Sequence, residues 1–251
     1  MAGEVDTHAD ARLKTGIAGL DEMLFGGIPM QNQVVIAGGP GSGKSLLCFE
    51  VLYNCARSGV PAAFITFEDR PEDVLKNAKE AFRDFGDIDG LVDDGMLNVC
   101  EEGLPIKAID REKDSMTSFG KIISDMEGMI RDTKARCVAL DSISLLQLVF
   151  PGTNTLSYRR SIVSLTASLR KMGVTALLTT EMSYADMDRE GFSPEFFVFD
   201  GIISLQKNSK SDRREFGMEI IKMRGTNHST AFAPYEITPS GFKVKPSPVG
   251  V

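Results

Sequence analysis

The sequence predicts an α/β fold, with a mainly parallel β-sheet flanked by helices and with antiparallel β-hairpins at the C-terminal end. Between residues 33 and 181, short apolar runs alternate with longer amphipathic segments, at the spacing of right-handed βαβ units. The apolar runs are nearly continuous, which is typical of strands that are covered on both faces. After residue 200 the helical periodicity stops, and apolar runs separated by polar turns predict hairpins.

Each expected element has its own local signal. Thr15 is a candidate cap for a short helix that Gly26 and Gly27 would end. Pro71 at a first turn and Gly86 as a stop delimit a helix whose apolar residues recur at helical spacing. The expected strands are 33–38, 62–68, 96–101, 136–143, 174–181, 201–208 and 213–225, with a last hairpin over 235–244. The expected helices are 44–59, 71–86, 118–133 and 157–173.

Size and composition indicate one globular domain. The chain has 251 residues, of which 42% are hydrophobic and 25% are charged, and this is enough to bury a full core. We expect a flexible segment at residues 1–12, one domain at 13–246 and a flexible tail at 247–251. No apolar run approaches the roughly 18 residues of a membrane span, and the first residues are too polar for a signal peptide. We therefore expect a cytoplasmic protein without membrane insertion.

Charge and cysteine content argue against further classes of function. A formal charge of −7 argues against non-specific binding to nucleic acid or to an anionic membrane, although a local basic patch stays possible. The cysteines form no CxxC pair and lie in or beside apolar stretches, so buried free thiols are expected rather than a metal site or disulfides. They are Cys48, Cys55, Cys100 and Cys137.

A phosphate-binding loop is the strongest motif in the chain. The stretch GGPGSGKS fits G-x-x-x-x-G-K-[ST] and lies between an apolar strand and a helix start, as the motif requires. Its backbone N–H groups and the helix N-terminus attract phosphate, Lys44 would reach the β- and γ-phosphates, and the Ser45 hydroxyl would ligate Mg²⁺. The alternative is a glycine-rich turn with a chance lysine. We expect ATP and Mg²⁺ as cofactors, with these loop residues as ligands: Gly39, Pro40, Gly41, Ser42, Gly43, Lys44, Ser45 and Leu46.

Three carboxylates follow buried strands. Asp141 comes after the run CVAL, so it should emerge at the carboxyl end of its strand, where ligands bind in open α/β sheets. We expect it to hold the metal, and a helix N-cap is the alternative. Glu68 and Asp69 end the run FITFED, and a carboxylate there could orient water for attack on the γ-phosphate. The alternative is that both acids simply start the next helix, where they favour the dipole.

Two cations stand one residue apart in the stretch IIKMRGTNHS, at residues 220–229. If this stretch is a strand, its period of two places Lys222 and Arg224 on one face and Ile221 and Met223 on the other. One interpretation is a solvated edge strand, in which the charges discourage edge pairing. The other is a pair that faces an anion.

These segments together resemble the KaiC-like branch of the RecA superfamily of ATPases. The resemblance rests on TGIAGLDEMLFGGIP, GGPGSGKS, FITFED, VALDSIS, LLTTE and IIKMRGTNH, and it extends from about Leu13 to Val244. The opening and closing segments are more specific than the phosphate loop, which unrelated proteins share. The resemblance implies a RecA-like P-loop NTPase core and an ATP-hydrolysing protein that assembles into a ring, usually a hexamer.

The resemblance also implies roles for individual residues. Lys222 and Arg224 match a K-x-R pair that contacts the phosphates of the neighbouring subunit's ATP and supports catalysis there, and His228 matches a position near that nucleotide. Glu68 would activate water and help to hold the metal, whereas Asp69 stands where the family usually has a second glutamate. A regulatory or signalling role with a protein partner is implied in general terms only.

One family activity is not carried over. Some members phosphorylate their own Ser and Thr just upstream of the strand that corresponds to DGIISLQ. In this chain Phe196 and Phe197 are the nearest aligned residues, and Ser193 is the closest hydroxyl.

Two other functions stay open. RecA-like recombinases and their small paralogues bind DNA through two loops, which would be about 150–160 and 183–195 here. The second loop holds four acids against Arg189 alone, which disfavours contact with DNA phosphates, and Arg159 and Arg160 in the first can be read as a solvated helix face. The third candidate is a scaffold that binds ATP without hydrolysing it.

Overall fold

The computed structural model describes residues 11–103, 112–150, 155–182, 194–208 and 215–246. Its strands are β1 Arg12–Leu13, β2 Ile28–Pro29, β3 Gln33–Gly38, β4 Ala62–Thr66, β5 Leu97–Glu101, β6 Cys137–Asp141, β7 Thr175–Glu181, β8 Gly201–Asn208, β9 Glu215–Met223, β10 Ala233–Thr238 and β11 Gly241–Val244. Its helices are α1 Ala18–Met23, α2 Lys44–Arg57, α3 Pro71–Ala81, α4 Ile88–Asp93, α5 Glu112–Thr133 and α6 Thr155–Met172, with 3-10 turns η2 Ile143–Val149 and η3 Pro194–Val198.

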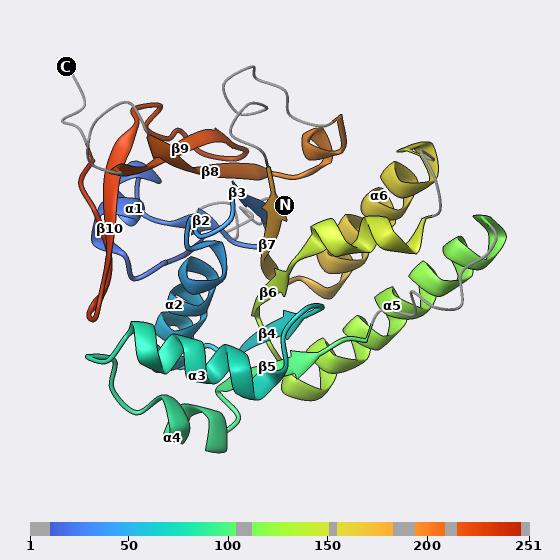
Figure 1. The fold of residues 1–251 in the computed structure, drawn as a ribbon, viewed down its shortest axis with the longest axis horizontal. Helices are drawn as coiled ribbons and strands as arrows, with labels where there is room; N and C mark the ends of the chain where they lie inside the picture. The colour runs from blue at the N-terminus through green and yellow to red at the C-terminus, as the bar shows by residue number, and fades with distance from the viewer. Residues whose placement is uncertain (1–10, 104–111, 151–154, 183–193, 209–214, 247–251) are drawn as a thin grey trace, which may run out of the picture.

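A nine-stranded sheet runs through the molecule in the order β11-β10-β9-β8-β3-β7-β6-β4-β5 (Figure 1). The pairs from β8 to β5 are parallel, and β9, β10 and β11 continue the sheet through antiparallel pairs. This is the α/β architecture with C-terminal hairpins that the sequence predicts. The carboxyl ends of the six parallel strands therefore share one edge of the sheet.

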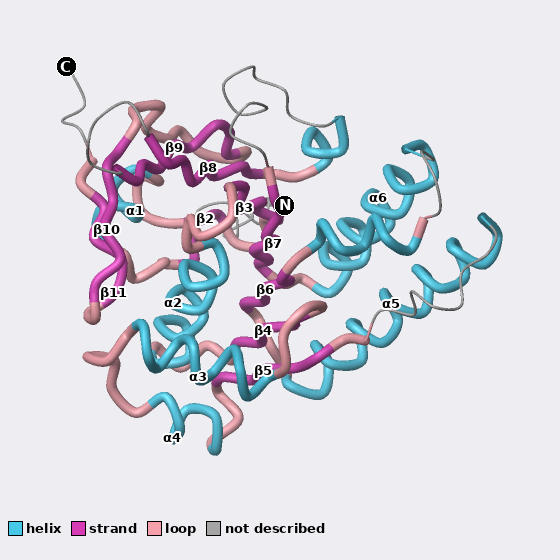
Figure 2. The backbone as a smooth tube through the Cα atoms, viewed as in Figure 1, coloured by secondary structure: helices cyan, strands magenta, loops and turns pink. Residues whose placement is uncertain are grey.

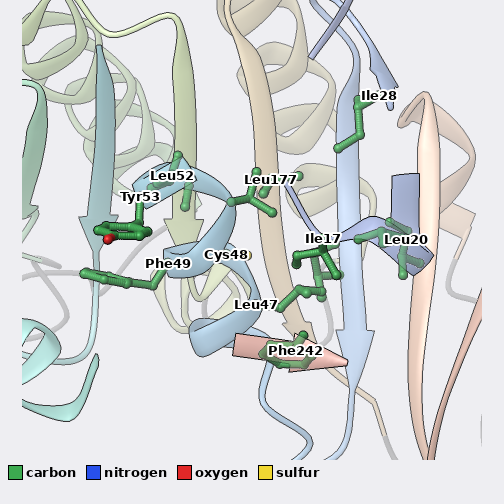
Figure 3. Packing of buried hydrophobic residues seen from close by; sticks show 14 of the residues in the cluster. Ile17, Leu20, Ile28, Leu47, Cys48, Phe49, Leu52, Tyr53, Leu177 and Phe242 are labelled. Atoms are coloured by element: carbon green, nitrogen blue, oxygen red, sulfur yellow. The ribbon is translucent and has the colours of Figure 1, made fainter. Parts of the chain in front are cut away.

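Helices cover both faces of the sheet, with α2 and α3 on one side and α5 and α6 on the other (Figure 2). Alternate residues of each central strand divide between two buried clusters, as the period of two requires. On β3, for example, Val34 and Ile36 join the cluster under α2, whereas Val35 and Ala37 join the cluster under α6. Figure 3 shows the first cluster, in which α2 packs against residues of β7, β11 and the segment before α1.

Several helix boundaries differ from the expectation: α5 begins at Glu112 rather than at 118, and the start of α1 and the end of α3 also differ. Thr15 does not cap α1; its hydroxyl instead donates to Asp21 Oδ1 at 2.8 Å, which ties the preceding loop to the helix. Helix α3 ends at Ala81 rather than at Gly86, because Phe82 and Phe85 stack on each other in a buried aromatic group, with ring centroids 4.5 Å apart. Five short elements have no counterpart among the expected ones, namely β1, β2, α4, η2 and η3.

The cysteines are free thiols, three of them buried and Cys100 half-buried. None of the helices in the described part of the chain is long and apolar enough to cross a membrane.

Candidate functional site

The loop between β3 and α2 forms the centre of the candidate site. Gly41 and Gly43 have φ angles of 71° and 90°, in the left-handed region that favours glycine. Ser42 N donates to Gly39 O at 3.3 Å, which closes a turn before the helix begins at Lys44. Pro40 and Ser45 are exposed, whereas Leu46 packs partly buried against the core under α2. The sequence motif therefore folds into a compact turn at the N-terminus of a 14-residue helix.

Lys44 folds back over its own loop. Its Nζ donates to Gly38 O at 3.0 Å and to Gly39 O at 3.2 Å, and the side chain is buried. Burial lowers the pKa of Lys44, while the nearby carboxylates of Glu181 and Asp141 act in the opposite direction. A buried ammonium group that is held by only two carbonyls keeps donor capacity for an anionic ligand.

The predicted carboxylates gather at the same edge of the sheet. Asp141 ends β6, next to Thr66 of β4 in the register, and its Oδ1 accepts a hydrogen bond from Thr179 Oγ1 of β7. Glu68 and Asp69 follow β4, and Thr66 Oγ1 accepts from both of their N–H groups, at 3.2 and 2.9 Å. That hydroxyl fixes the turn after β4, and because α3 begins only at Pro71, the two acids precede the helix instead of starting it.

The carboxylates at this end of the strands lie close enough to affect the pKa of Glu68. The pKa of Glu68 is raised by partial burial and then by the carboxylates of Asp69, Asp141 and Glu181, while Lys44 acts in the opposite direction. Glu181 was not predicted as a site residue. It ends β7 and pairs in register with Gly38 at the start of the loop. The signal that identified Asp141, an acid directly after a buried strand, is also present for Glu181.

Lys222 and Arg224 lie at the other end of the strands, beside the residues where the parallel strands begin. Because β9 runs antiparallel to β8, its last residues lie beside the first residues of the parallel strands. Lys222 pairs with Ile202, which pairs with Val35, so Lys222 is about 10 Å from Gly38 along the strands and about 10 Å across them. The two cations therefore do not meet the phosphate loop of their own chain.

The two side chains converge on the end of η3. Lys222 Nζ donates to Phe199 O at 2.6 Å and to Phe197 O at 3.3 Å, and Arg224 Nη2 donates to Phe197 O at 3.0 Å. Arg224 also forms an ion pair with Asp200 at 3.5 Å. Burial lowers the pKa of Lys222, and the charge of Arg224 lowers it further. The two cationic side chains are thus held together at the end of η3 instead of extending separately into solvent.

A β-bulge in β9 changes which of its residues share a face. The register passes from Ile202↔Lys222 to Ile203↔Ile220, so Ile221 has no partner on β8. Beyond the bulge the alternation is inverted, and Ile221 packs against the cluster under α6 while Met223 belongs to the cluster under α2. The expectation that Ile221 and Met223 share a face is therefore wrong.

The remaining predicted positions are dispersed. His228 is half-buried in the loop after β9, and its Nδ1 lies 3.2 Å from Ser229 O. Arg159 and Arg160 are exposed on α6. Most of the two candidate DNA-binding loops lies outside the described residues, as does Ser193, whereas Phe196 is buried and Phe197 is 65% exposed.

The C-terminal hairpin also contacts the loop, which the sequence did not indicate. Tyr235 Oη donates to Ser42 O at 2.6 Å, although 193 residues separate the two in sequence. No motif or spacing marks Tyr235, because the contact depends on how β10 packs over the start of α2.

Comparison with known proteins identifies the family. The family model of the KaiC ATPase matches residues 13–249. A UPF0273 protein from Aeropyrum pernix is 34% identical over 241 residues, which cover 95% of each chain, and a UPF0273 protein from Thermotoga maritima is 32% identical over 245 residues, which cover 95% of this chain and 98% of the relative. The circadian clock oscillator protein KaiC from Synechococcus elongatus is 31% identical over 243 residues, but the match covers only 45% of that longer protein. With its phosphate loop on a RecA-like sheet, the chain belongs to the KaiC ATPase family of the RecA superfamily.

Proposed function

We propose that this protein is a Mg²⁺-dependent ATPase that assembles into a ring, with each nucleotide held between two copies of the chain. The observation that carries the proposal is the shared sheet edge at which Lys44, Asp141, Glu68 and Glu181 gather around the phosphate loop. A regulatory or signalling role, a hexameric ring and a single ATPase domain over residues 13–246 belong to the same proposal.

Each group at this edge has a separate task. The loop N–H groups and Lys44 bind the phosphates, and Lys44 exchanges its two carbonyl partners for phosphate oxygens. Asp141 and Ser45 offer the oxygen ligands that Mg²⁺ prefers, and few protein ligands are needed because phosphates and water complete its shell. When bound, Mg²⁺ neutralises charge that builds up on the transferred phosphoryl group.

Glu68 is the candidate that orients the attacking water. Partial burial and then the neighbouring carboxylates raise the pKa of Glu68, which makes it a better proton acceptor than an isolated surface glutamate. Asp69 lies beside it and contributes to that shift. A shorter acid at this position, where relatives in the family usually carry glutamate, leaves Glu68 as the group with the longer reach.

The cations must act on another subunit if they act in catalysis. In the register, Lys222 lies level with Val35, three residues before Gly38, and Arg224 lies beyond it toward the start of β3. Both side chains are bound to carbonyls at the end of η3, away from the loop of their own chain. Supplied in trans, they would stabilise negative charge on the γ-phosphoryl group, as arginine fingers do. His228, four residues beyond Arg224, would accompany them to the neighbour's nucleotide.

Two measurements on the same sample test this proposal. Size-exclusion chromatography with light scattering, with and without ATP and Mg²⁺, measures assembly, and a phosphate-release assay measures turnover. We expect ATP to promote the ring, because a ligand that contacts two subunits favours their association by mass action, and we expect phosphate release that depends on Mg²⁺. A ring without phosphate release would instead identify the non-hydrolysing scaffold, and a monomer that does not bind ATP would refute the proposal.

A further inference from the structure

The C-terminal hairpin, β10 and β11, packs directly on the phosphate loop. Tyr235 of β10 is 2% exposed, and its hydroxyl donates to Ser42 O at 2.6 Å. We propose that Tyr235 is a positioning residue that orients the loop for phosphate binding. This inference rests on the proposed ATP site and adds to it a residue that does not touch the nucleotide.

Peptide geometry converts this hydrogen bond into an orientation of the loop. The peptide bond that joins Ser42 and Gly43 is planar and trans, so its C=O and N–H point in opposite directions. Because Tyr235 holds the Ser42 carbonyl, the Gly43 N–H of the same peptide must point away from the hairpin. Backbone N–H groups of this kind cradle phosphates in phosphate-binding loops. The hydroxyl thus fixes the direction of one phosphate donor before any nucleotide arrives.

Apolar contacts close the same side of the loop. A Cβ atom added to Gly43 would lie 2.6 Å from Ile237 Cδ1 and 3.1 Å from Phe242 Cζ, both on the hairpin. Gly43 is therefore fixed by its positive φ and by the hairpin together, and the loop cannot swing toward β10. Tyr235 and Ile237 restrain successive residues of the loop, one by a hydrogen bond and the other by packing.

The hairpin is itself anchored to the helix that follows the loop. Phe242 N donates to Glu50 Oε2 at 2.7 Å, and Glu50 is buried in α2. The Tyr235 ring packs between Phe216 and Phe242, with centroid distances of 5.5 Å to each. The hydroxyl is consequently held by a rigid surrounding, so little ordering is needed when phosphate binds. Binding and hairpin packing are then coupled, and each strengthens the other.

Tyr235→Phe tests the inference, because it removes only the hydroxyl and keeps the aromatic packing. The matched control is Tyr53→Phe in α2, the helix that follows the loop. Tyr53 is buried, stacks on Phe85 at 4.3 Å, and accepts a hydrogen bond from Gly86 N at 2.8 Å, remote from the phosphate loop. Both variants lose one buried hydroxyl that bonds to a backbone group.

The measurements are the Kd for ATP with Mg²⁺ by calorimetry, the KM and kcat of phosphate release, and unfolding by urea. We expect Tyr235→Phe to weaken ATP binding about fivefold, which corresponds to one lost hydrogen bond, and to raise KM with kcat nearly unchanged. Tyr53→Phe should lose a similar amount of stability and keep the wild-type affinity. Equal ATP affinities of wild type and Tyr235→Phe, or an equal weakening in both variants, would overturn the inference. A wild-type protein that fails to bind ATP would instead refute the proposed function.

Discussion

Mixing two inactive variants tests whether catalysis uses residues from two subunits. Arg224→Ala removes the guanidinium group that would be supplied in trans, and Glu68→Gln removes the carboxylate that would orient water. Each variant alone lacks one of these groups at every interface, so each should be nearly inactive. In a mixed ring, an interface regains both groups when a Glu68→Gln subunit supplies Arg224 to the loop of an Arg224→Ala subunit.

The size of the effect follows from the geometry. Arg224 N donates to Asp200 O, and Asp200 N donates to Gln33 O, which places Arg224 level with the start of β3. The loop lies beyond Gly38, five residues further along, or about 16 Å along the strand. If Arg224 acts on a nucleotide, that nucleotide should therefore belong to a neighbouring subunit. With random assembly of equal amounts, half of the fingers and half of the carboxylates are intact, so about one quarter of the interfaces in a cyclic ring combine both.

The assay is the rate of phosphate release per subunit at a fixed total concentration. The variants should be mixed without ATP, so that subunits exchange, and ATP and Mg²⁺ should then be added. We expect about one quarter of the wild-type rate at equal amounts, with a maximum near that ratio. As a control, each variant should also be mixed with subunits that carry both substitutions, Glu68→Gln and Arg224→Ala. Neither mixture can form an interface that has both groups, so both should stay inactive. A mixture no faster than the sum of its parts, in protein that light scattering shows to be assembled, would refute the trans arrangement.

Three further outcomes are expected. Lys44→Ala should weaken ATP binding by at least about 100-fold in calorimetry, since a charge-assisted contact to phosphate is lost; unchanged affinity in the folded variant would exclude this lysine as a phosphate ligand. Glu68→Gln should keep ATP bound and slow phosphate release by about 10² to 10³-fold, and if Asp69→Asn has that effect instead, the roles of the two acids are reversed. Burial raises the pKa of Glu50 to about 7, so the folded state binds a proton at this carboxyl group more tightly than the unfolded state does. This difference contributes to the free energy of unfolding in full below the usual glutamate pKa, and the contribution is lost as pH rises through about 7. Relative to Glu50→Gln, the free energy of unfolding of the wild type should fall by about 3 kcal/mol between pH 4.5 and pH 8, and a difference that does not change with pH in urea titrations would contradict this.

Local patterns were sufficient to predict the parallel core. Strand β3 and helix α2 each carry their signal within one segment: a continuous apolar run, then glycines, then a helix with apolar residues on the buried side. The acids that follow β4 and β6 could be placed together from sequence, because the carboxyl ends of parallel strands meet at one edge. The end of α3 could not be predicted from the sequence, because Phe82 leaves the helix to stack with Phe85. Nothing in the local sequence distinguishes that packing from one more helical turn.

Contacts between distant segments explain what the sequence could not provide. The bulge at Ile221 depends on how β8 and β9 pair, and it changes which residues share a face without changing the sequence pattern. The contact of Tyr235 with Ser42 depends on the position of β10 in the sheet, six strands from β4, which Glu68 and Asp69 follow. The phosphate loop thus lies between two sets of restraints: carboxylates follow the parallel strands on one side, and a hairpin fixes its backbone from the other. If both sets act on one nucleotide, loss of the Tyr235 hydroxyl should weaken ATP binding, and loss of the Glu68 carboxylate should slow turnover. The two residues lie on different elements, so a variant that lacks both groups should show the product of the two single effects on kcat/KM.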